Sequence, residues 1–142
     1  MSFPTSASEI AKLLNLIPHP EGGYYKETYR CDESVTRSDG TTRSAGTAIY
    51  YLLVGTEPAA WHKVASDEIW HYYAGDLLEL ELRDEEGISS VHKLGMDPAH
   101  GAYPQFIIPK HIWQRARCTG LWTLVGCTVS PGFDFADFEM IS

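Results

Sequence analysis

The chain has 142 residues and a mass of 15.9 kDa, which is enough for one folded domain with a buried core. Its net charge of −8 and its scattered Lys and Arg residues argue against nucleic-acid binding, and its aromatic content of 12% argues against disorder. With three cysteines, no C-x-x-C spacing, no signal-peptide core and no membrane-length apolar stretch, we expect a cytoplasmic protein without disulfides or a membrane partner.

The first predicted element is a helix near the N-terminus. Ser6 and Glu9 have the spacing of a capping box, which is typical of a helix start. Apolar residues follow at helical intervals, namely Ile10, Leu13, Leu14 and Ile17. Because Pro18 and Pro20 end the pattern, residues 1–20 are predicted to form this helix and the lead-in to the rest of the domain.

The remainder of the chain has the pattern of β-structure. The predicted strands are residues 24–30, 47–54, 68–73, 77–83, 105–108 and 121–130. Residues 47–54 form a continuous apolar run, typical of a buried strand, and residues 78–82 alternate strictly between Leu and Glu. Gly75 and Asp76 predict a hairpin turn. Many short strands at regular spacing predict an all-β sandwich or barrel over residues 21–142, with ligands bound inside.

A group of polar residues is expected inside this barrel. His62 and Glu68 lie on adjoining predicted strands, in the pattern H-x-V-x-x-x-E. Tyr51 lies on the preceding strand, and Gln114 begins another strand further along the chain. Histidine is the natural base near neutral pH, and a carboxylate can orient it or carry a proton itself. This combination suits proton transfer at a sugar carbon.

Two stretches carry a resemblance to a known family. The spacing of His62, Glu68 and Gly75 resembles the first cupin motif, and residues 109–114 (PKHIWQ) resemble the second. His111 stands where the second motif has glycine, and it would adopt a turn with positive φ at a cost. Longer phrases are similar to a small single-domain cupin family of uncharacterised function: LIPHPEGGYYKETYR at 16–30, RSAGTAIYYLL at 43–53, WHKVASDEIWHYYAGD at 61–76 and LVGCTVSPGFDF at 124–135.

The resemblance implies a fold and a metal-ligand pattern. It implies one cupin domain over residues 1–142, a double-stranded β-helix or jelly-roll barrel, and a homodimer. Most cupins hold a metal with three histidines and one glutamate. His62 and Glu68 match two of these ligands, whereas Val64 and Gln114 replace the others, so a divalent metal would be weakly held at most and no cofactor is required. His71 would need a β-bulge to join the site, because strand parity sends it to the opposite face from Glu68.

The resemblance also implies a function. Metal-poor cupins include nucleotide-sugar epimerases, and metal-bearing cupins include phosphomannose and phosphoglucose isomerases. We therefore expect a sugar isomerase or epimerase acting on a phosphorylated or nucleotide-linked sugar. His62 would be the general base, Glu68 its partner or a second proton carrier, and Tyr51 and Gln114 would hold substrate oxygens.

Further candidates for substrate binding come from several segments. They are Lys26, Arg30, Arg43 and Ser44 for phosphate, together with Thr47, His71 and Trp113. Gly22 and Gly23 predict a turn before the first strand, and His19, in a predicted loop, is given no role. Two other functions stay open: a non-catalytic module that binds a nucleotide or sugar nucleotide, and a metal-dependent enzyme such as a dioxygenase.

Overall fold

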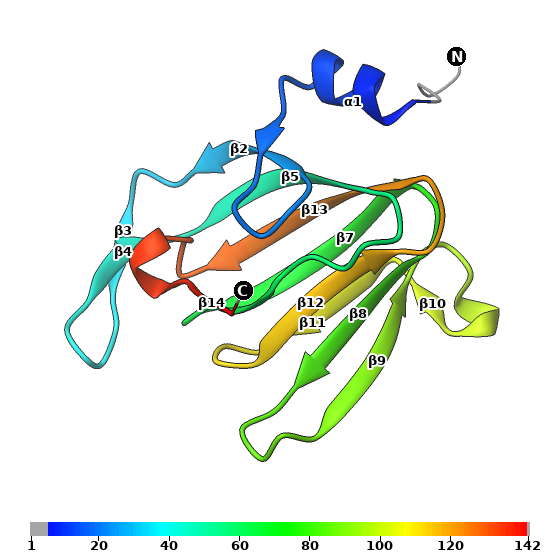
Figure 1. The fold of residues 1–142 in the computed structure, drawn as a ribbon. Coiled ribbons are helices and arrows are strands. Elements are labelled where there is room, and N and C mark those ends of the chain that lie inside the picture. Colours follow the sequence, from blue (N-terminus) through cyan, green and yellow to red (C-terminus); the bar gives the residue numbers. More distant parts are fainter. Residues whose placement is uncertain (1–5, 142) are drawn as a thin grey trace.

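Two β-sheets that pack face to face form most of the structure, a computed structural model that describes residues 6–141 (Figure 1). The first sheet has the order β1 (Ile17–Pro18), β2 (Tyr24–Arg30), β5 (Thr47–Val54), β13 (Trp122–Ser130), β7 (Asp67–Gly75) and β11 (Gln105–Ile108). The second has the order β10 (Ala102–Tyr103), β9 (Ser89–Leu94), β8 (Leu78–Arg83), β12 (Trp113–Cys118), β6 (Trp61–Lys63) and β14 (Glu139–Ile141). Strands β3 (Ser34–Thr36) and β4 (Thr42–Ser44) form a separate hairpin, and two short 3-10 helices, η1 (Pro98–His100) and η2 (Phe135–Asp137), lie in connections. The predicted all-β barrel is confirmed.

The main core lies between the two sheets. Tyr51 of β5 and Trp70 of β7 pack in one cluster with Leu80 of β8 and Ala116 of β12. The alternation predicted for residues 78–82 is also confirmed, because Leu78 and Leu80 are buried and Leu82 is partly buried against the core, while Glu79 and Glu81 face outward. The first sheet therefore contributes large aromatic side chains to the interior, and the second contributes mainly aliphatic ones.

The N-terminal helix is shorter than the sequence predicts. Helix α1 spans Ala7–Leu13, and the Ser6 side chain caps it by accepting a hydrogen bond from the Glu9 backbone N–H at 3.2 Å. Asn15 adopts φ of 57°, a left-handed conformation that ends helices, and Ile17 then joins strand β1. The prediction that Ile17 extends the helical face is therefore wrong. Ile10 anchors α1 on the outer surface of the first sheet.

Gly75 and Asp76 do not form the predicted hairpin. Strand β7 pairs with β11 and β13, whereas β8 pairs with β9 and β12, so the turn carries the chain from one sheet to the other. The Asp76 backbone N–H donates to the Trp122 carbonyl at 2.8 Å, and an Asp76 carboxylate oxygen accepts from the Leu121 N–H at 2.7 Å. These bonds tie the turn to the start of β13, and because β11 and β13 occupy the two edges of β7, β8 cannot pair with it.

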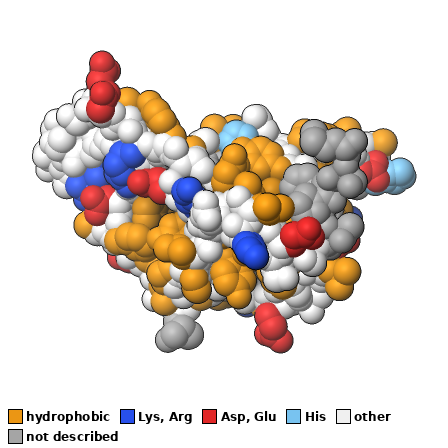
Figure 2. Space-filling model, turned by 90° about the horizontal axis from the view of Figure 1, so that it is seen from above, with side chains coloured by type: hydrophobic (Ala, Val, Ile, Leu, Met, Phe, Trp, Pro, Cys, Tyr) orange, Lys and Arg blue, Asp and Glu red, His pale blue; other side chains and the backbone are white. Residues whose placement is uncertain are grey.

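Several strands were not predicted from the sequence, among them β3, β4, β9 and β14 as well as the two-residue strands β1 and β10. Each is short or largely exposed, so it lacks the buried periodic pattern on which sequence analysis depends. Seen from above, the surface carries several separate patches of hydrophobic side chains among charged ones (Figure 2). Among residues 6–141, no helix has the length and apolar character that crossing a membrane requires.

Candidate active site

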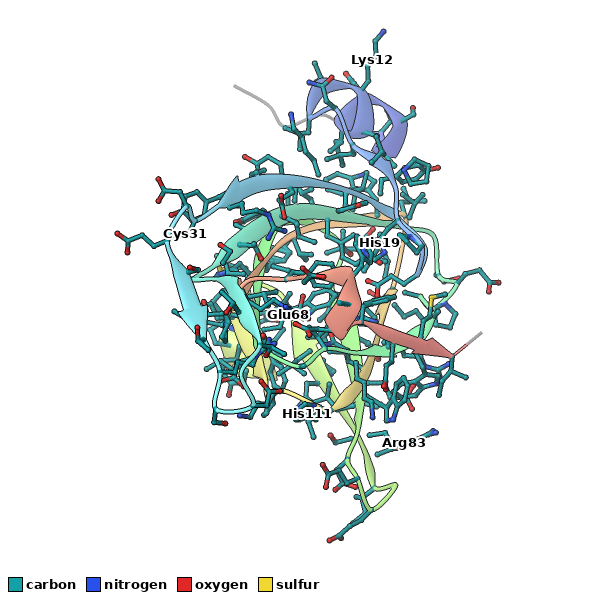
Figure 3. The ribbon with its side chains drawn as sticks, turned by 90° about the vertical axis from the view of Figure 1, so that its left-hand side faces the viewer. Lys12, His19, Cys31, Glu68, Arg83 and His111 are labelled. Atoms are coloured by element: carbon teal, nitrogen blue, oxygen red, sulfur yellow. The ribbon has the colours of Figure 1, made fainter. Side chains whose placement is uncertain are left out.

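A pocket lies between the sheets and has about 460 Å³ of empty space, part of it open to solvent. Its wall comes from both sheets, from the segment that joins β1 to β2, and from the segment that follows β13. The lining residues are His19, Glu21, Tyr25, Thr47, Ile49, Tyr51, His62, Val64, Glu68, Trp70, Cys127, Val129, Phe133 and Phe138. Figure 3 shows His19 and Glu68 in the interior, whereas Lys12 points away from the barrel.

The closest polar contact in the pocket joins His62 to a residue outside the predicted site. A carboxylate oxygen of Glu21 lies 2.5 Å from Nδ1 of His62, and both side chains are only 5% exposed. His62 comes from β6, while Glu21 comes from the segment between β1 and β2. Because Nδ1 is held by the carboxylate, the other ring nitrogen, Nε2, is the one left to meet a ligand.

The two carboxyl groups of the pocket have pKa shifts of opposite sign. Burial raises the pKa of Glu21, but the charge and hydrogen bond of His62 outweigh it, so the net pKa is lowered. Burial lowers the pKa of His62, and Glu21 more than reverses this, so the net pKa is raised. Burial raises the pKa of Glu68, with a smaller opposing effect from the charge of His62. Glu21 and His62 thus stabilise each other's charged forms, whereas burial shifts the neighbouring Glu68 toward its protonated form.

Glu68 is oriented by the amide of Gln114. The Gln114 Nε2 donates to a Glu68 oxygen at 3.0 Å, and both residues are buried. The two strands belong to different sheets, so this hydrogen bond crosses the barrel interior. Thus the structure brings together His62, Glu68 and Gln114 as the sequence suggested, although Gln114 contacts Glu68 and does not line the pocket itself.

Tyr51 lies in the pocket, but its hydroxyl is already used. It donates to the Gly22 carbonyl at 2.6 Å and thereby fastens the 19–23 segment to β5. Gly23 lies so close to β5 that an added Cβ would be 2.6 Å from the Leu52 carbonyl oxygen. With φ of 76° as well, this position requires glycine. The Gly22-Gly23 pair is therefore needed to bring Glu21 to the barrel interior.

His19 is the second histidine of the pocket. Its Nδ1 accepts a hydrogen bond from the Glu21 backbone N–H at 3.1 Å, so that nitrogen carries no proton. Burial lowers the pKa of His19 more than the nearby Glu21 raises it, which favours the neutral ring. His19 also packs edge-on against Tyr25, with ring centroids 4.6 Å apart. It is therefore a neutral, hydrogen-bonded part of the wall.

Aromatic rings from the C-terminal segment close one side of the pocket. The Phe138 ring stacks on His62, with centroids 5.4 Å apart and an interplanar angle of 28°. Phe133 lines the same side, and its ring lies 6.0 Å from that of Phe138. The catalytic candidate His62 is thus held between a carboxylate and an aromatic ring.

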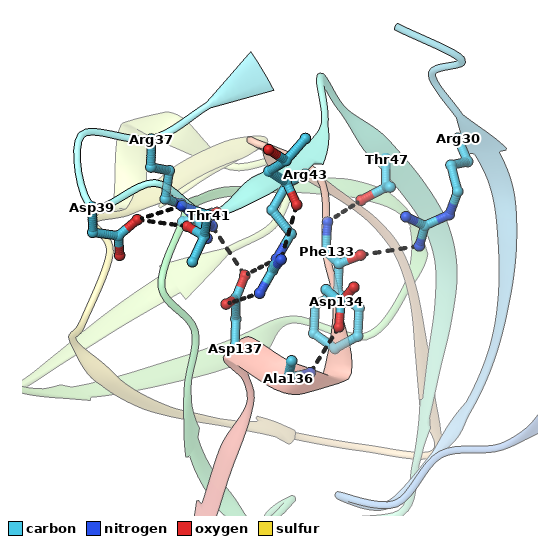
Figure 4. A network of polar contacts seen from close by, with 12 residues as sticks. Arg30, Arg37, Asp39, Thr41, Arg43, Thr47, Phe133, Asp134, Ala136 and Asp137 are labelled. Atoms are coloured by element: carbon cyan, nitrogen blue, oxygen red, sulfur yellow. Dashed lines mark hydrogen bonds and ion pairs between the residues drawn. The ribbon is translucent and has the colours of Figure 1, made fainter. Parts of the chain in front are cut away.

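Two arginines from the β3–β4 hairpin fasten this segment (Figure 4). Arg43 makes two hydrogen bonds to the Asp137 carboxylate, at 3.0 and 2.9 Å, and Arg37 reaches the same carboxylate at 3.0 Å. Arg37 also donates to the Ser66 hydroxyl at 2.6 Å. Hydrogen bonds to Arg43 lower the pKa of Asp137 below its usual value. We call these residues, Arg37, Arg43 and Asp137, the arginine clamp.

Three residues predicted to contact substrate instead make hydrogen bonds within the protein, two of them to Phe133 of the C-terminal segment. The Thr47 hydroxyl accepts from the Phe133 backbone N–H at 2.9 Å, and Arg30 donates to the Phe133 carbonyl at 3.0 Å while pairing with Glu27 (Figure 4). The Ser44 hydroxyl donates to the Cys31 carbonyl at 2.7 Å. Of these three, Thr47 is the one that also lines the pocket.

The remaining predicted contacts lie outside the pocket. Lys26 is exposed on β2, in register with Tyr50. His71 bonds the Thr128 hydroxyl at 3.0 Å on the outer face of the first sheet, as its parity relative to Glu68 indicated. Trp113 has the opposite parity from Gln114, and the Lys63 ammonium lies 4.9 Å from its ring centre.

The residues that match the cupin metal ligands do not fit a metal ion. Among residues 6–141, no group of three or more His, Cys, Asp or Glu side chains has an arrangement that could hold one. Val64 offers no donor atom, His62 is paired with Glu21, and Gln114 directs its amide N–H at Glu68. This donor set supports no step through a metal.

The sequence patterns did not predict the parts of the pocket that come from connecting segments, namely His19, Glu21, Phe133 and Phe138, nor the contribution of Tyr25 on β2. The one local signal was the pair Gly22-Gly23, which was interpreted as a simple turn. A glycine pair just after a His and a Glu also indicates that the chain passes close to another strand, and here that approach delivers Glu21.

A barrel of two mainly antiparallel sheets, with a pocket between them that contains buried His and Glu side chains, defines a cupin-type protein. Residues 8–141 match the family described as Cupin superfamily (DUF985), so the chain belongs to that family. It is also 29% identical, over 159 aligned residues, to the uncharacterized protein YML079W of Saccharomyces cerevisiae. That alignment covers 98% of this chain and 78% of the yeast protein.

Solved structures agree with this assignment. Protein SO0799 from Shewanella oneidensis is 36% identical, with a TM-score of 0.89 over 98% of this chain and 86% of that chain. A hypothetical protein from Leishmania major is 33% identical, also with a TM-score of 0.89, over 97% of this chain and 88% of that one. Oxalate decarboxylase from Bacillus subtilis is 13% identical, with a TM-score of 0.63 over 87% of this chain and 29% of that one, and this likeness concerns the fold alone.

Proposed function

We propose that this protein is an isomerase or epimerase that moves a proton at the carbon beside the carbonyl of a phosphorylated or nucleotide-linked sugar. The observation that carries the proposal is the pair of His62 and Glu21 beside Glu68, with the two carboxyl groups shifted in opposite directions. Such a separation of pKa values within one pocket is the usual arrangement for acid and base chemistry near neutral pH.

In the proposed reaction, His62 first gives its Nε2 proton to solvent, and the neutral ring then accepts the proton from carbon on Nε2 while its Nδ1–H stays bonded to Glu21. The carboxylate stabilises the imidazolium that forms. Glu68 donates its own proton to the carbonyl oxygen, which gives an enediol and a Glu68 carboxylate. In an isomerisation, His62 then gives its proton to the neighbouring carbon while the hydroxyl group on the first carbon returns a proton to the Glu68 carboxylate. In an epimerisation, the enol hydroxyl returns its proton to Glu68, a water molecule protonates the same carbon from the other side, and the hydroxide that forms takes the proton of the His62 imidazolium.

The charge of the pocket limits where a phosphate can bind. No Lys or Arg is found among the lining residues of this pocket within the described chain. A phosphate inside would therefore face Glu21 and Glu68 without a compensating guanidinium or ammonium group. We infer that the sugar carbons enter the barrel while the phosphate or nucleotide stays at the mouth.

The test is proton NMR in D₂O with mannose 6-phosphate, fructose 6-phosphate and a nucleotide-linked keto sugar. We expect wild type to wash solvent deuterium into the carbon beside the carbonyl, and His62→Ala to lose this activity. His92→Ala, which alters a histidine on β9 away from the pocket, is the matched control. Ligand signals that broaden without any exchange would instead support a non-catalytic binding module, which the aromatic wall of the pocket also suits.

A further inference from the structure

The indole of Trp70 has an unused hydrogen-bond donor inside the barrel. Trp70 lies two residues after Glu68 on β7, so both side chains point to the same face of the strand. The residue is 1% exposed and lines the pocket. Among residues 6–141, its Nε1 has no hydrogen-bond partner. Buried donors of this kind are nearly always paired, because an unpaired one loses its hydration without compensation.

The neighbours of Trp70 do not supply an acceptor. Cys127 stands opposite it in register on β13, and the ring of Tyr51 lies edge-on with centroids 5.9 Å apart. The two carboxyl groups of the pocket are engaged elsewhere, Glu21 with His62 and Glu68 with the amide of Gln114. No described residue accepts from Trp70 Nε1, so this donor is free to bind an acceptor on a molecule that enters the pocket.

We propose that the Trp70 Nε1–H binds an oxygen atom of the substrate, an inference that rests on the proposed function. An indole N–H can donate and cannot accept, so its partner is a carbonyl or hydroxyl oxygen and not an ammonium group. Glu68, the proton donor of the proposed reaction, lies on the same face of β7. The oxygen between the two is the one that gains negative charge when His62 removes the carbon-bound proton, and Trp70 stabilises that charge.

This role makes a kinetic prediction. Trp70→Phe keeps an aromatic ring but removes the donor, so the rate of deuterium exchange at saturating substrate should fall roughly 10²-fold. KM should change far less, because the bond strengthens as charge develops on the oxygen. Trp113→Phe, an equivalent change on the outer face, should leave both values unchanged. A purely structural role of Trp70 would lower thermal stability without this separation of kcat from KM.

A second measurement observes the donor itself in the wild-type protein. With ¹⁵N-labelled tryptophan, the four indole N–H signals can be assigned from single Trp→Phe variants and followed during addition of the same three sugars. We expect the Trp70 signal to move downfield with a sugar that exchanges deuterium, while the signals of Trp61 and Trp113 stay in place.

The outcomes separate the two proposals. Deuterium exchange with an unmoved Trp70 signal would overturn the role of Trp70 and leave the proposed function intact, as expected if the ring of Tyr51 already satisfies the N–H. Absence of both exchange and any indole shift with all three sugars would overturn the two together. A shifted Trp70 signal without exchange would support oxygen binding and remove the isomerase proposal.

Discussion

Glu21 and His62 meet at 2.5 Å although they come from segments that are far apart in the sequence and share no strand pairing. The carboxylate of Glu21 and the ring of His62 compensate each other's charge in the barrel interior, where an isolated buried charge would be costly. Gly23 and the hydroxyl of Tyr51 keep the segment that carries Glu21 against β5. The electrostatics of His62 are thus set from outside the two sheets.

Replacing Glu21 with Gln should lower the pKa of His62, because it removes the charge that raises it. The change should also reduce deuterium exchange by roughly 10²-fold, since the base becomes weaker and less well oriented. Titration of the histidine Cε1–H signals by NMR measures the pKa directly. Glu27→Gln, which alters an exposed partner of Arg30, is the control, and an unchanged His62 titration would contradict the assigned pair.

The same pair predicts a pH window for stability. His62 has a raised pKa, so its contribution is complete below its ordinary value of 6.5 and is lost as pH rises through the folded value. Glu21 has a lowered pKa, so its contribution is complete above its ordinary value of 4.5 and is lost as pH falls through the folded value. In urea titrations, Glu21→Gln should therefore lose most stability relative to wild type between these two ordinary values.

Glu68→Gln should have the opposite effect on stability. Because the folded protein raises the pKa of Glu68, its burial becomes less favourable as pH rises above the ordinary value of 4.5. Glutamine cannot ionise, so the variant should melt at a higher temperature than wild type at about pH 8 and at a similar temperature at about pH 4. Exchange activity should be lost at both. Equal melting temperatures throughout would show that Glu68 is ionised without cost.

Weakening the arginine clamp should cost both stability and substrate affinity. Asp137→Asn leaves Arg37 and Arg43 without their carboxylate, and we expect a loss of about 1.5–3 kcal/mol in urea unfolding, the range for hydrogen bonds to charged groups. KM should rise because Phe138 loses its support. Glu139→Gln, which removes an exposed pair with Lys63, should cost less than about 1 kcal/mol. Similar losses in the two variants would argue against the clamp.

His111 tests the backbone of the second motif. It adopts φ of 67°, as the glycine at the corresponding position of the cupin motif suggested, and its N–H donates to the Val64 carbonyl at 2.8 Å. His111→Gly should relieve about 1–2 kcal/mol of left-handed strain, offset by about 0.5–1 kcal/mol of added chain entropy in the unfolded state. We expect a small net gain in urea unfolding. Lys110→Gly, where φ is not positive, should lose stability instead.

Periodic sequence patterns predicted the fold well where a strand has one buried face. Thr47–Val54 is a strand as predicted, although residues 48–50 are only partly buried and Val54 is exposed. The alternating residues of β8 have the predicted faces, since burial fixes which side chains point inward. The turn at Gly75 was interpreted wrongly because the choice between a hairpin and a change of sheet depends on Asp76 contacting the start of β13. The residues in that contact are 45 positions apart in the sequence, so no local pattern indicates it.

In the candidate site, too, the residues on strands were predicted from the sequence and those in connecting segments were not. His62, Glu68 and Gln114 lie on strands, and strand parity was sufficient to predict that they meet in the interior. Glu21 and Phe138 lie in connecting segments, where no periodicity relates a residue to the barrel. Their positions depend on close backbone approach and on the arginine clamp, both of which are properties of the folded chain.

The wall of the pocket combines residues 19–25 with residues 133–138, so it joins the beginning and the end of the described chain. During synthesis every strand except β14 precedes Phe133 and Phe138 in the chain, and until these two residues emerge His62 lacks one side of its pocket. A nascent chain therefore has most of its strands before it has a closed site. Any ligand that requires the aromatic wall can bind, and so stabilise the fold, only after translation has reached the C-terminal segment.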